Sequence, residues 1–333
     1  MKDFTVIFFQ RKPRTYGNFS IEILFEAIRS KLPPFIHSKT VISKYESNGL
    51  WKRIYNTIEA YFRQGDINHV TGDVHFLTFL LKKKKTILTI HDCGFMNHPS
   101  RVARQILKLF WLKFPIARSE LITVVSQATK DDILKHISCN PKKIVVIPNF
   151  ILPGFNLFPK EFNSKQPRLL HIGTAPNKNL ERLIEAIQGI DCQLDIIGKL
   201  NERQFKLLNN YNIQYTNYYN LTELEIIQRY HQCDILTFVS TFEGFGVPIL
   251  EAQAIERAVI TSSISSMPEV AGDGACLVDP YNVIDIRQGI LRIIKDEEYR
   301  NQIIYKGKEN VKHFKLEVII KQYVNLYEQL LHS

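Results

Sequence analysis

Short apolar runs alternate with helical patterns along this chain, and no other feature constrains its fold as tightly. In the first half the candidate strands lie at residues 4–9, 40–43, 67–71, 86–90, 121–125 and 144–147. In the second half they lie at 168–172, 194–197, 213–215, 235–239, 259–261 and 276–278. Helical patterns separate the second set at 180–188, 202–209, 223–233, 248–257 and 284–296. Strands that alternate with helices form parallel sheets covered by helices, so the pattern predicts an α/β fold with two such sheets.

An irregular stretch at residues 148–159, which contains three prolines, separates the two sets of strands. The chain has 333 residues, more than a single core usually holds. We therefore predict a first domain at 1–150, a linker at 151–165 and a second domain at 166–312. The amphipathic pattern within 313–333 predicts a C-terminal helix.

The charge of the chain is concentrated in its first half. Residues 1–150 contain 24 Lys and Arg against 11 Asp and Glu, a net charge of +13, whereas the rest contains 19 against 22, or −3. A basic half could meet nucleic acid or an anionic membrane surface. No nucleic-acid-binding motif accompanies the charge. We therefore expect the basic half to meet an anionic membrane surface and not nucleic acid.

One segment of the basic half has the pattern of a surface helix. At residues 100–114, Arg101, Arg104 and Lys108 recur at helical spacing beside an aromatic, leucine-rich face. This helix could rest on a membrane, or it could pack against the core with a hydrated basic side.

No apolar run reaches the length of a membrane span, and the apolar run near the start is too short for a signal peptide. Together with five scattered cysteines, these features predict a cytoplasmic protein, with or without peripheral attachment to the inner membrane face.

Residues 240–252, STFEGFGVPILEA, connect a buried strand to a helix and are the most informative motif. The chain turns through Gly244 and Gly246 and is predicted to enter a helix at Pro248, which suits a first helical position. Backbone N–H groups and the helix dipole make such a turn an anion site. Glu243 and Glu251, with seven residues between them, flank this site, and carboxylates bind hydroxyls rather than phosphates. Phosphate flanked by hydroxyls describes a sugar nucleotide.

A second loop supplies a cation at the same edge of the predicted sheet. The strand at 168–172 ends at Gly173, and the loop through Thr174 delivers Lys178 to the start of a helix. An ammonium there can pair with a diphosphate and stabilise the charge that grows on a leaving group. The alternative is a solvated lysine near a helix start. Gly198 ends the next strand, although glycines that end strands are also common turn devices.

In the first domain, candidate ligand-binding residues follow two strands. His91 and Asp92 follow the strand at 86–90, where open α/β sheets bind ligands, although a lone histidine there can also be structural. Asp92 could orient His91 or face an acceptor hydroxyl. Gly17, in the loop after the first strand, would let the backbone approach a ligand. His69 and His75 are interpreted as packing or loop residues.

The segment around Glu243 and Glu251 resembles the Glu-x7-Glu signature of the retaining GT-B glycosyltransferases of family 4. The likeness continues through residues 252–254, 259–263, 268–274 and 277–280. It implies two Rossmann-like domains that face each other across a cleft, with the terminal helix crossing back onto the first domain. Relatives have Gly and Pro where this chain has Glu256 and Ala258. If Glu256 is left-handed, the backbone costs roughly 1 kcal/mol.

The resemblance also assigns roles to residues. It implies that Glu251 holds the ribose hydroxyls, Glu243 the donor sugar and Lys178 the diphosphate, while His91 touches the transferred sugar. The donor site is further implied to contain Gly17, Gly173, Thr174, Gly198, Gly244, Phe245, Gly246 and Val247. Relatives often carry an arginine in the Gly173–Lys178 loop, which is one residue shorter here. Its role is then vacant or filled by Arg11 or Arg14.

The implied function is retaining transfer of a sugar from a UDP- or GDP-linked nucleotide sugar to a saccharide or lipid-linked acceptor, as in surface polysaccharide or lipopolysaccharide biosynthesis. No metal or other cofactor is expected, because the chain lacks an Asp-x-Asp pair and a His/Cys cluster. The alternatives are a sugar-nucleotide epimerase or phosphorylase of the same fold, and a non-catalytic, basic membrane-surface scaffold.

Overall fold

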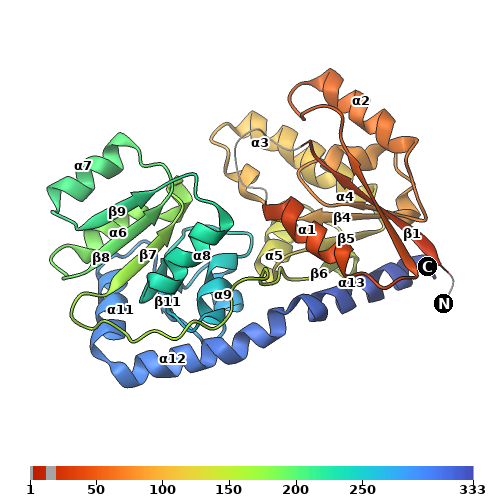
Figure 1. The fold of residues 1–333 in the computed structure, drawn as a ribbon. Coiled ribbons are helices and arrows are strands. Elements are labelled where there is room, and N and C mark those ends of the chain that lie inside the picture. Colours follow the sequence, from red (N-terminus) through yellow and green to blue (C-terminus); the bar gives the residue numbers. More distant parts are fainter. Residues whose placement is uncertain (1–2, 13–19, 333) are drawn as a thin grey trace. The chain divides into compact units, whose positions relative to one another are not determined.

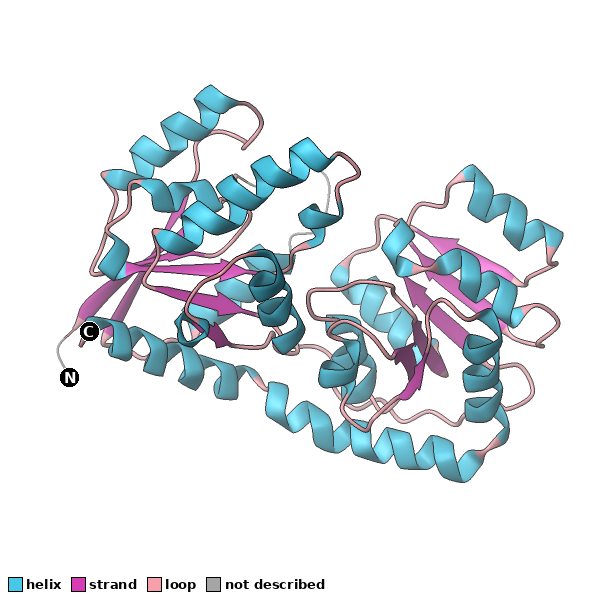
Figure 2. Ribbon diagram, turned by 180° about the vertical axis from the view of Figure 1, so that it is seen from behind, coloured by secondary structure: helices cyan, strands magenta, loops and turns pink. Residues whose placement is uncertain are grey.

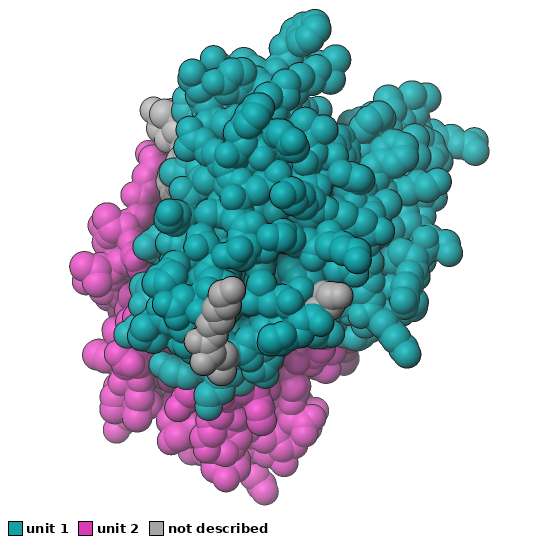
Figure 3. Space-filling model, turned by 90° about the vertical axis from the view of Figure 1, so that its right-hand side faces the viewer, with its two compact units in different colours: residues 1–149, 316–333 teal, residues 150–315 magenta. Residues whose placement is uncertain are grey.

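A computed structural model describes residues 3–12 and 20–332 of the protein. The chain forms two compact units, coloured separately in Figure 3. Unit 1 consists of Met1–Asn149 and Leu316–Ser333, and unit 2 of Phe150–Lys315. Residues 151–165, predicted to form a linker, therefore belong to unit 2.

Unit 1 is built on a parallel six-stranded sheet with the order β2-β1-β3-β4-β5-β6 (Figure 1). The strands are β1 (Phe4–Gln10), β2 (Ile36–Ile42), β3 (Ile67–Val70), β4 (Thr86–Ile90), β5 (Leu121–Val124) and β6 (Ile144–Val146). β3 and β4 are buried along their whole length, as expected for parallel strands covered on both faces. β2, the edge strand, is buried only at Ile36 and is otherwise exposed or half-buried, and it begins four residues before its predicted start.

Helices flank this sheet (Figure 2). They are α1 (Ser20–Ser30), α2 (Leu50–Tyr61), α3 (Arg101–Leu107), α4 (Phe114–Ala117), α5 (Gln127–His136) and α13 (Leu316–Leu331). A π-helical turn, η4 (Lys108–Lys113), joins α3 to α4, and short 3-10 helices lie at η1 (His75–Phe79), η2 (Lys83–Lys85), η3 (Gly94–Asn97) and η5 (Pro141–Lys143).

The C-terminal helix α13 belongs to the core of unit 1. Tyr327 on α13 is fully buried, and its hydroxyl lies 2.8 Å from Nδ1 of His69 on β3. Nε2 of His69 lies 2.8 Å from the Thr89 hydroxyl on β4. Burial lowers the pKa of His69 to about 3, so this histidine is neutral. His69 is therefore a packing residue, as predicted.

Unit 2 contains a second parallel six-stranded sheet, ordered β12-β11-β10-β7-β8-β9. Its strands are β7 (Arg168–Ile172), β8 (Gln193–Ile197), β9 (Tyr215–Tyr218), β10 (Ile235–Phe238), β11 (Ala258–Ser262) and β12 (Cys276–Val278). Its helices are α6 (Leu180–Ile187), α7 (Glu202–Asn210), α8 (Glu223–Gln232), α9 (Val247–Ala254), α10 (Met267–Ala271), α11 (Val283–Lys295) and α12 (Glu297–Asn310), with 3-10 turns at η6 (Pro176–Lys178) and η7 (Val311–Phe314).

Local sequence explains where two helices of unit 2 begin. Asn201 and Thr222 form reciprocal capping boxes with Gln204 and Glu225, which start α7 and α8. The predicted helix at 248–257 is wrong at both ends, because α9 begins at Val247 and ends at Ala254. Glu256 has φ +60°, so the left-handed conformation considered for it is confirmed.

The two parallel sheets with flanking helices confirm the predicted two-domain, Rossmann-like α/β fold. Among residues 3–12 and 20–332, none of the helices combines the length and the apolar character that crossing a bilayer requires.

Candidate functional site

The loops after β7 and β10, which are neighbouring strands, form the densest cluster of predicted site residues. The N–H of Thr241 donates to the carbonyl of Asn177 at 2.8 Å, and the Asn177 side-chain amide donates to the carbonyl of Phe242 at 3.0 Å. The two loops are therefore held side by side at the carboxyl edge of the sheet, where open α/β sheets bind ligands.

Lys178 and Glu243 meet across these loops. The Lys178 Nζ atom lies 2.7 Å from Oε1 of Glu243, and both side chains are largely buried. Nζ also lies 5.0 Å from the centre of the Phe238 ring. Gly173, at φ +92°, permits this arrangement, because a Cβ there would come within 2.8 Å of Lys178 Cγ. The structure thus brings the predicted cation and the first predicted carboxylate into contact.

Two serines that the sequence did not single out shape the turn that carries Glu243. The hydroxyl of Ser266 donates to the carbonyls of Glu243 and Phe245 at 3.0 and 2.6 Å, and that of Ser265 to the carbonyl of Glu243 at 2.8 Å. Gly246, at φ +117°, then turns the chain into α9. These bonds orient the carbonyl oxygens of Glu243 and Phe245 toward Ser265 and Ser266 and so fix the conformation of the turn.

Glu251 lies at the start of the second turn of α9 rather than in the first, because the helix begins at Val247. Tyr230, fully buried on α8, donates its hydroxyl hydrogen to Oε2 of Glu251. Burial raises the pKa of Glu251 to about 7, although the bond from Tyr230 opposes that shift. Glu251 is therefore a carboxyl group that changes charge near neutral pH. The sequence missed Tyr230, which lies 21 positions before its partner.

Thr174 and Gly198 contact each other at the neighbouring strand end. The Thr174 hydroxyl donates to the carbonyl of Lys199 at 2.7 Å. A Cβ on Gly198, whose φ is +143°, would come within 2.8 Å of Thr174 Cγ2. Thr174 also lines a cavity of about 350 Å³ with residues of α6 and α7. The Thr174 side chain thus points toward the loop after β8.

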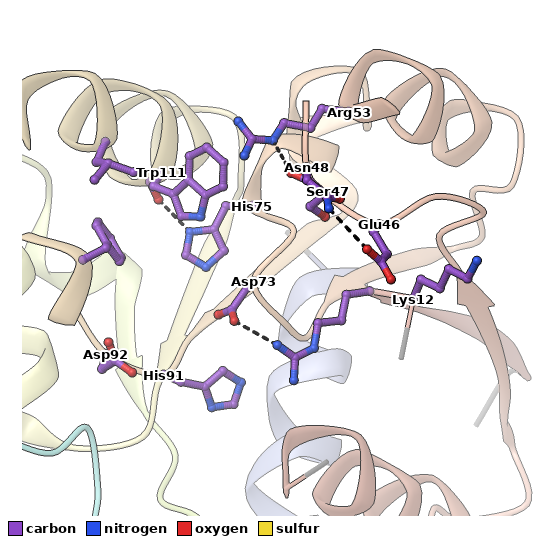
Figure 4. A pocket seen from close by; sticks show the side chains of 13 residues that line it. Lys12, Glu46, Ser47, Asn48, Arg53, Asp73, His75, His91, Asp92 and Trp111 are labelled. Atoms are coloured by element: carbon purple, nitrogen blue, oxygen red, sulfur yellow. Dashed lines mark hydrogen bonds and ion pairs between the residues drawn. The ribbon is translucent and has the colours of Figure 1, made fainter. Parts of the chain in front are cut away.

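Unit 1 contains a larger cavity of about 820 Å³ (Figure 4). Its lining residues come from the segments after β1 to β4, including helix α2, and from the α3–η4 segment: Arg11, Lys12, Glu46, Ser47, Asn48, Arg53, Asp73, His75, His91, Asp92, Phe95, Leu107 and Trp111. Acidic and basic side chains line the cavity together, and an indole provides an apolar wall.

The two histidines of this cavity bond to backbone carbonyls. Nε2 of His91 donates to the carbonyl of Thr71 at 2.9 Å, because a carbonyl can only accept. A neutral His91 then has its lone pair on Nδ1. Nδ1 of the mostly buried His75 bonds to the carbonyl of Trp111 at 2.7 Å. The interpretation of His75 as a packing or loop residue is incomplete, because this residue also lines the cavity.

Other predicted residues of unit 1 are engaged locally. Asp92 accepts a hydrogen bond from the N–H of Gly94 at 2.7 Å, so it bonds to the adjacent turn rather than to His91. Arg11 pairs with Glu22 at 2.7 Å and with Asp73 at 3.2 Å. Gly17 and Arg14 lie outside the described residues.

In the described part of the chain, no group of three or more His, Cys, Asp or Glu side chains could hold a metal ion. That the reaction needs no metal stays a prediction.

Two family models cover most of the chain. "Glycosyltransferase Family 4" matches residues 8–153, and "Glycosyl transferases group 1" matches residues 155–310. The chain belongs to the group 1, family 4 glycosyltransferases. It is a glycosyltransferase enzyme of GT-B fold, as the resemblance implied. This membership favours sugar transfer over the epimerase, phosphorylase and scaffold alternatives.

Individual relatives agree with the family. The O-antigen chain mannosyltransferase B of Escherichia coli is 26% identical over 278 residues, which cover 74% of this chain and 71% of that protein. A glycosyltransferase from Rickettsia africae has a TM-score of 0.77 at 17% identity, with 99% of each chain covered. HepE of Anabaena, solved with UDP and glucose, has a TM-score of 0.75 at 14% identity and covers 98% of this glycosyltransferase and 100% of its own chain. At these identities the two structures show a shared fold.

Proposed function

We propose that this glycosyltransferase moves a sugar, with retention of configuration and without a metal, from a UDP- or GDP-linked nucleotide sugar to a saccharide or lipid-linked acceptor. The observation that carries the proposal is the Lys178–Glu243 pair, 2.7 Å apart, at the carboxyl edge of β7 and β10. The glycine turn before α9 and Glu251 lie on the same chain segment. These residues offer a cation for a diphosphate and carboxylates for hydroxyls.

The donor is divided among these groups. Glu251 accepts hydrogen bonds from the ribose hydroxyls, and Tyr230 orients its carboxylate. Glu243 binds hydroxyls of the sugar, and the backbone of Gly244, Phe245, Gly246 and Val247 binds the sugar and the distal phosphate. Gly173, Thr174 and Gly198 shape the loops around the nucleotide. A bound diphosphate competes with Glu243 for the Lys178 ammonium.

Transfer proceeds as a front-face displacement. The bond between the sugar C1 and the diphosphate oxygen breaks, and Lys178 stabilises the charge on the departing diphosphate. The acceptor oxygen bonds to C1 on the same face, and its proton passes to a phosphate oxygen that is leaving. His91, which lines the cavity of unit 1, contacts the transferred sugar.

The cavity of unit 1 and the relatives support the acceptor side of the proposal. A volume of about 820 Å³ accommodates saccharide units, and Trp111 supplies an aromatic wall. The Escherichia coli relative builds O-antigen chains, by its name, which supports an acceptor in surface polysaccharide or lipopolysaccharide biosynthesis. The net charge of +13 over residues 1–150 supports peripheral association of a cytoplasmic enzyme with anionic membrane, and the scattered cysteines favour the cytoplasmic location.

Melting curves with UDP, GDP, ADP and their sugars test the donor assignment. A ligand at 100 times its Kd stabilises the protein by about 2.7 kcal/mol. One base should shift the melting temperature most, and Lys178→Ala should reduce that shift, whereas Lys206→Ala, on an exposed part of α7, should not. If no nucleotide shifts the curve of the unmodified protein, the donor assignment is wrong.

Product analysis tests the reaction. With the donor that the melting curves identify and a membrane-lipid acceptor fraction, the new linkage should keep the donor's anomeric configuration, as read by NMR. A chelator should leave the rate unchanged. An inverted linkage, or a rate lost to the chelator and restored by a divalent cation, would contradict the proposed mechanism.

A further inference from the structure

Helix α2 exposes its large apolar side chains instead of burying them. Trp51 is 81% exposed, Phe62, just after the helix, 78% and Leu50 68%. The other exposed members of this stripe are Ile54, Tyr55, Ile58 and Tyr61. Their spacing places all seven on one side of the helix. We call these seven residues the α2 stripe.

The opposite side of α2 attaches the helix to unit 1 through small and polar residues. Asn56, Thr57 and Ala60 are its buried members. The Asn56 amide donates to the carbonyl of Tyr45 at 2.8 Å, and its oxygen accepts from the Tyr45 N–H at 3.1 Å. Figure 1 shows α2 (orange) at the periphery of its unit. Because the helix is anchored from behind, the stripe is a fixed feature of the folded unit.

Basic residues border the stripe. Residues 39–63 contain four Lys and Arg outside the cavity, at 39, 44, 52 and 63, against two acidic residues, Glu46 and Glu59. The fifth, Arg53, lies on the other side of the helix and lines the cavity, with its guanidinium 4.6 Å from the centre of the Trp111 ring. The Lys44 Nζ atom lies 5.3 Å from the ring centre of Tyr55. Glu59 pairs with Arg63 at 3.2 Å, which neutralises one of the two carboxylates. An exposed apolar stripe with aromatic side chains and a basic border is the pattern of a helix that lies in the interface of an anionic membrane.

The helix singled out from the sequence is less suited to this role. In the α3–η4 segment Val102, Ile106 and Phe110 are exposed, but Leu112 is buried. Leu107 and Trp111 line the cavity of unit 1. The apolar side chains of that segment are therefore divided among solvent, core and cavity.

A second copy of the chain is a poorer occupant of the stripe than a lipid surface. In a twofold dimer the same patch faces itself, so the two basic borders would meet and repel each other. Anionic lipid headgroups complement that border.

We propose that the α2 stripe docks the enzyme on anionic membrane, with Trp51 and Phe62 entering the boundary between headgroups and acyl chains. This inference deepens the membrane association of the proposed function and rests on it only for its biological purpose. The contact itself needs neither donor nor acceptor.

Tryptophan fluorescence tests the docking directly, because the chain has two tryptophans, Trp51 and Trp111. In a Trp111→Phe background, emission comes from Trp51 alone. Mixed phosphatidylglycerol–phosphatidylcholine vesicles should shift this emission to shorter wavelength, and brominated acyl chains should quench it. Pure phosphatidylcholine vesicles should do so much less. Emission that the mixed vesicles leave unchanged would overturn the proposal.

Paired variants locate the surface. Trp51→Ser combined with Phe62→Ser should lower partitioning onto the mixed vesicles about tenfold or more, since two large apolar groups leave the interface. The matched change in α3, Val102→Ser with Ile106→Ser, should leave partitioning nearly unchanged. The reverse result would overturn the assignment to α2. If the first pair proves unstable in a melting curve, the fluorescence measurement, in which α2 is unchanged, decides.

Two controls distinguish docking on lipid from self-association and from donor binding. Sedimentation without lipid should show the same molecular mass for the Trp111→Phe protein and the α2 variant, and a dimer lost in the variant would overturn the proposal in favour of a second copy. The melting shift with nucleotide should be equal in the α2 variant and the unmodified protein. Failure of that shift in both proteins would remove the proposed donor site while leaving the vesicle result intact.

Discussion

Both units place an ion pair where the strand order of their sheet reverses, but the residues around the two pairs differ in chemistry. In each sheet the strand order reverses at one place, between β7 and β10 in unit 2 and between β1 and β3 in unit 1. Ligands bind at such switch points. A cation and a carboxylate bridge both: Lys178 meets Glu243 at 2.7 Å, and Arg11 meets Asp73 at 3.2 Å.

The difference lies in what surrounds each pair. In unit 2, Gly173 and Gly246 have positive φ, and serine hydroxyls hold the turn, so backbone geometry shapes the site. In unit 1, mainly side chains line a cavity of about 820 Å³. A site made of backbone would suit the diphosphate that the proposed UDP- and GDP-linked donors share. A site lined by side chains can be altered residue by residue to suit one acceptor.

The largest expected effect is the loss of kcat when Lys178 of unit 2 is removed. The same loss on removal of Arg11 in unit 1 would contradict the difference between the two pairs. Lys178→Ala should lower kcat about 100- to 1000-fold, because it removes charge stabilisation of the leaving group. Arg11→Ala should act mainly on the KM for the acceptor, since Arg11 already bridges Glu22 and Asp73. Steady-state kinetics with both substrates varied, with Lys206→Ala as the control, measures both. Equal losses of kcat in the two variants would show that the pairs do not differ in role.

Removing Ser266 tests the claim that backbone geometry shapes the site of unit 2. Ser266→Ala leaves the carbonyls of Glu243 and Phe245 without its hydroxyl, which should cost about 1–3 kcal/mol of unfolding free energy and weaken donor binding. Ser265→Ala removes a donor to the Glu243 carbonyl, which Ser266 also serves, and a longer contact of 3.3 Å from the Glu243 N–H, so it should cost less. Urea denaturation and nucleotide titration are the measurements. Donor affinity unaffected in both variants would argue against this role of the turn.

The pH dependence of donor binding should sharpen the contrast, since its cause lies in unit 2. The fold raises the pKa of Glu251 from 4.5 to about 7. Ionised Glu251 is the better acceptor for ribose hydroxyls, so affinity for a sugar nucleotide should rise several-fold as pH rises through that value.

Rising pH should affect stability in the opposite direction from donor affinity. The native state binds the proton more tightly, so this group's contribution to the free energy of unfolding falls between pH 4.5 and about 7. Tyr230→Phe removes a bond that lowers the pKa, so it should move the affinity transition to higher pH. Glu251→Gln should abolish the transition, and a transition that persists in it would assign the effect to another group.

The smallest effect concerns the backbone behind α9. Glu256→Gly should stabilise the protein by up to roughly 1 kcal/mol, because glycine adopts the left-handed conformation without strain. The 2.8 Å ion pair with Lys308 would be lost, but a surface pair of this kind contributes little. Lys308→Ala measures that contribution separately. A melting temperature that falls in Glu256→Gly by more than it does in Lys308→Ala would contradict the assignment of strain.

Local pattern predicted much of this molecule and failed where contacts are remote. The strands, the glycine turn and the loop of Lys178 could be located because each follows from a few adjacent residues. Tyr230 and Ser266 could not, since their roles depend on which elements the sheet places together. The stripe on α2 is a different failure, because periodicity reveals an apolar side of a helix but not whether that side faces the core or solvent.

The bond between Tyr327 and His69 has a consequence for how this protein is made. Unit 1 is discontinuous in sequence, and unit 2 is inserted between its residues 149 and 316. The core around His69 therefore stays incomplete until the last helix has been synthesised. On the ribosome, unit 2 can finish folding while unit 1 still waits for its final segment. The order of completion is then the reverse of the order of synthesis.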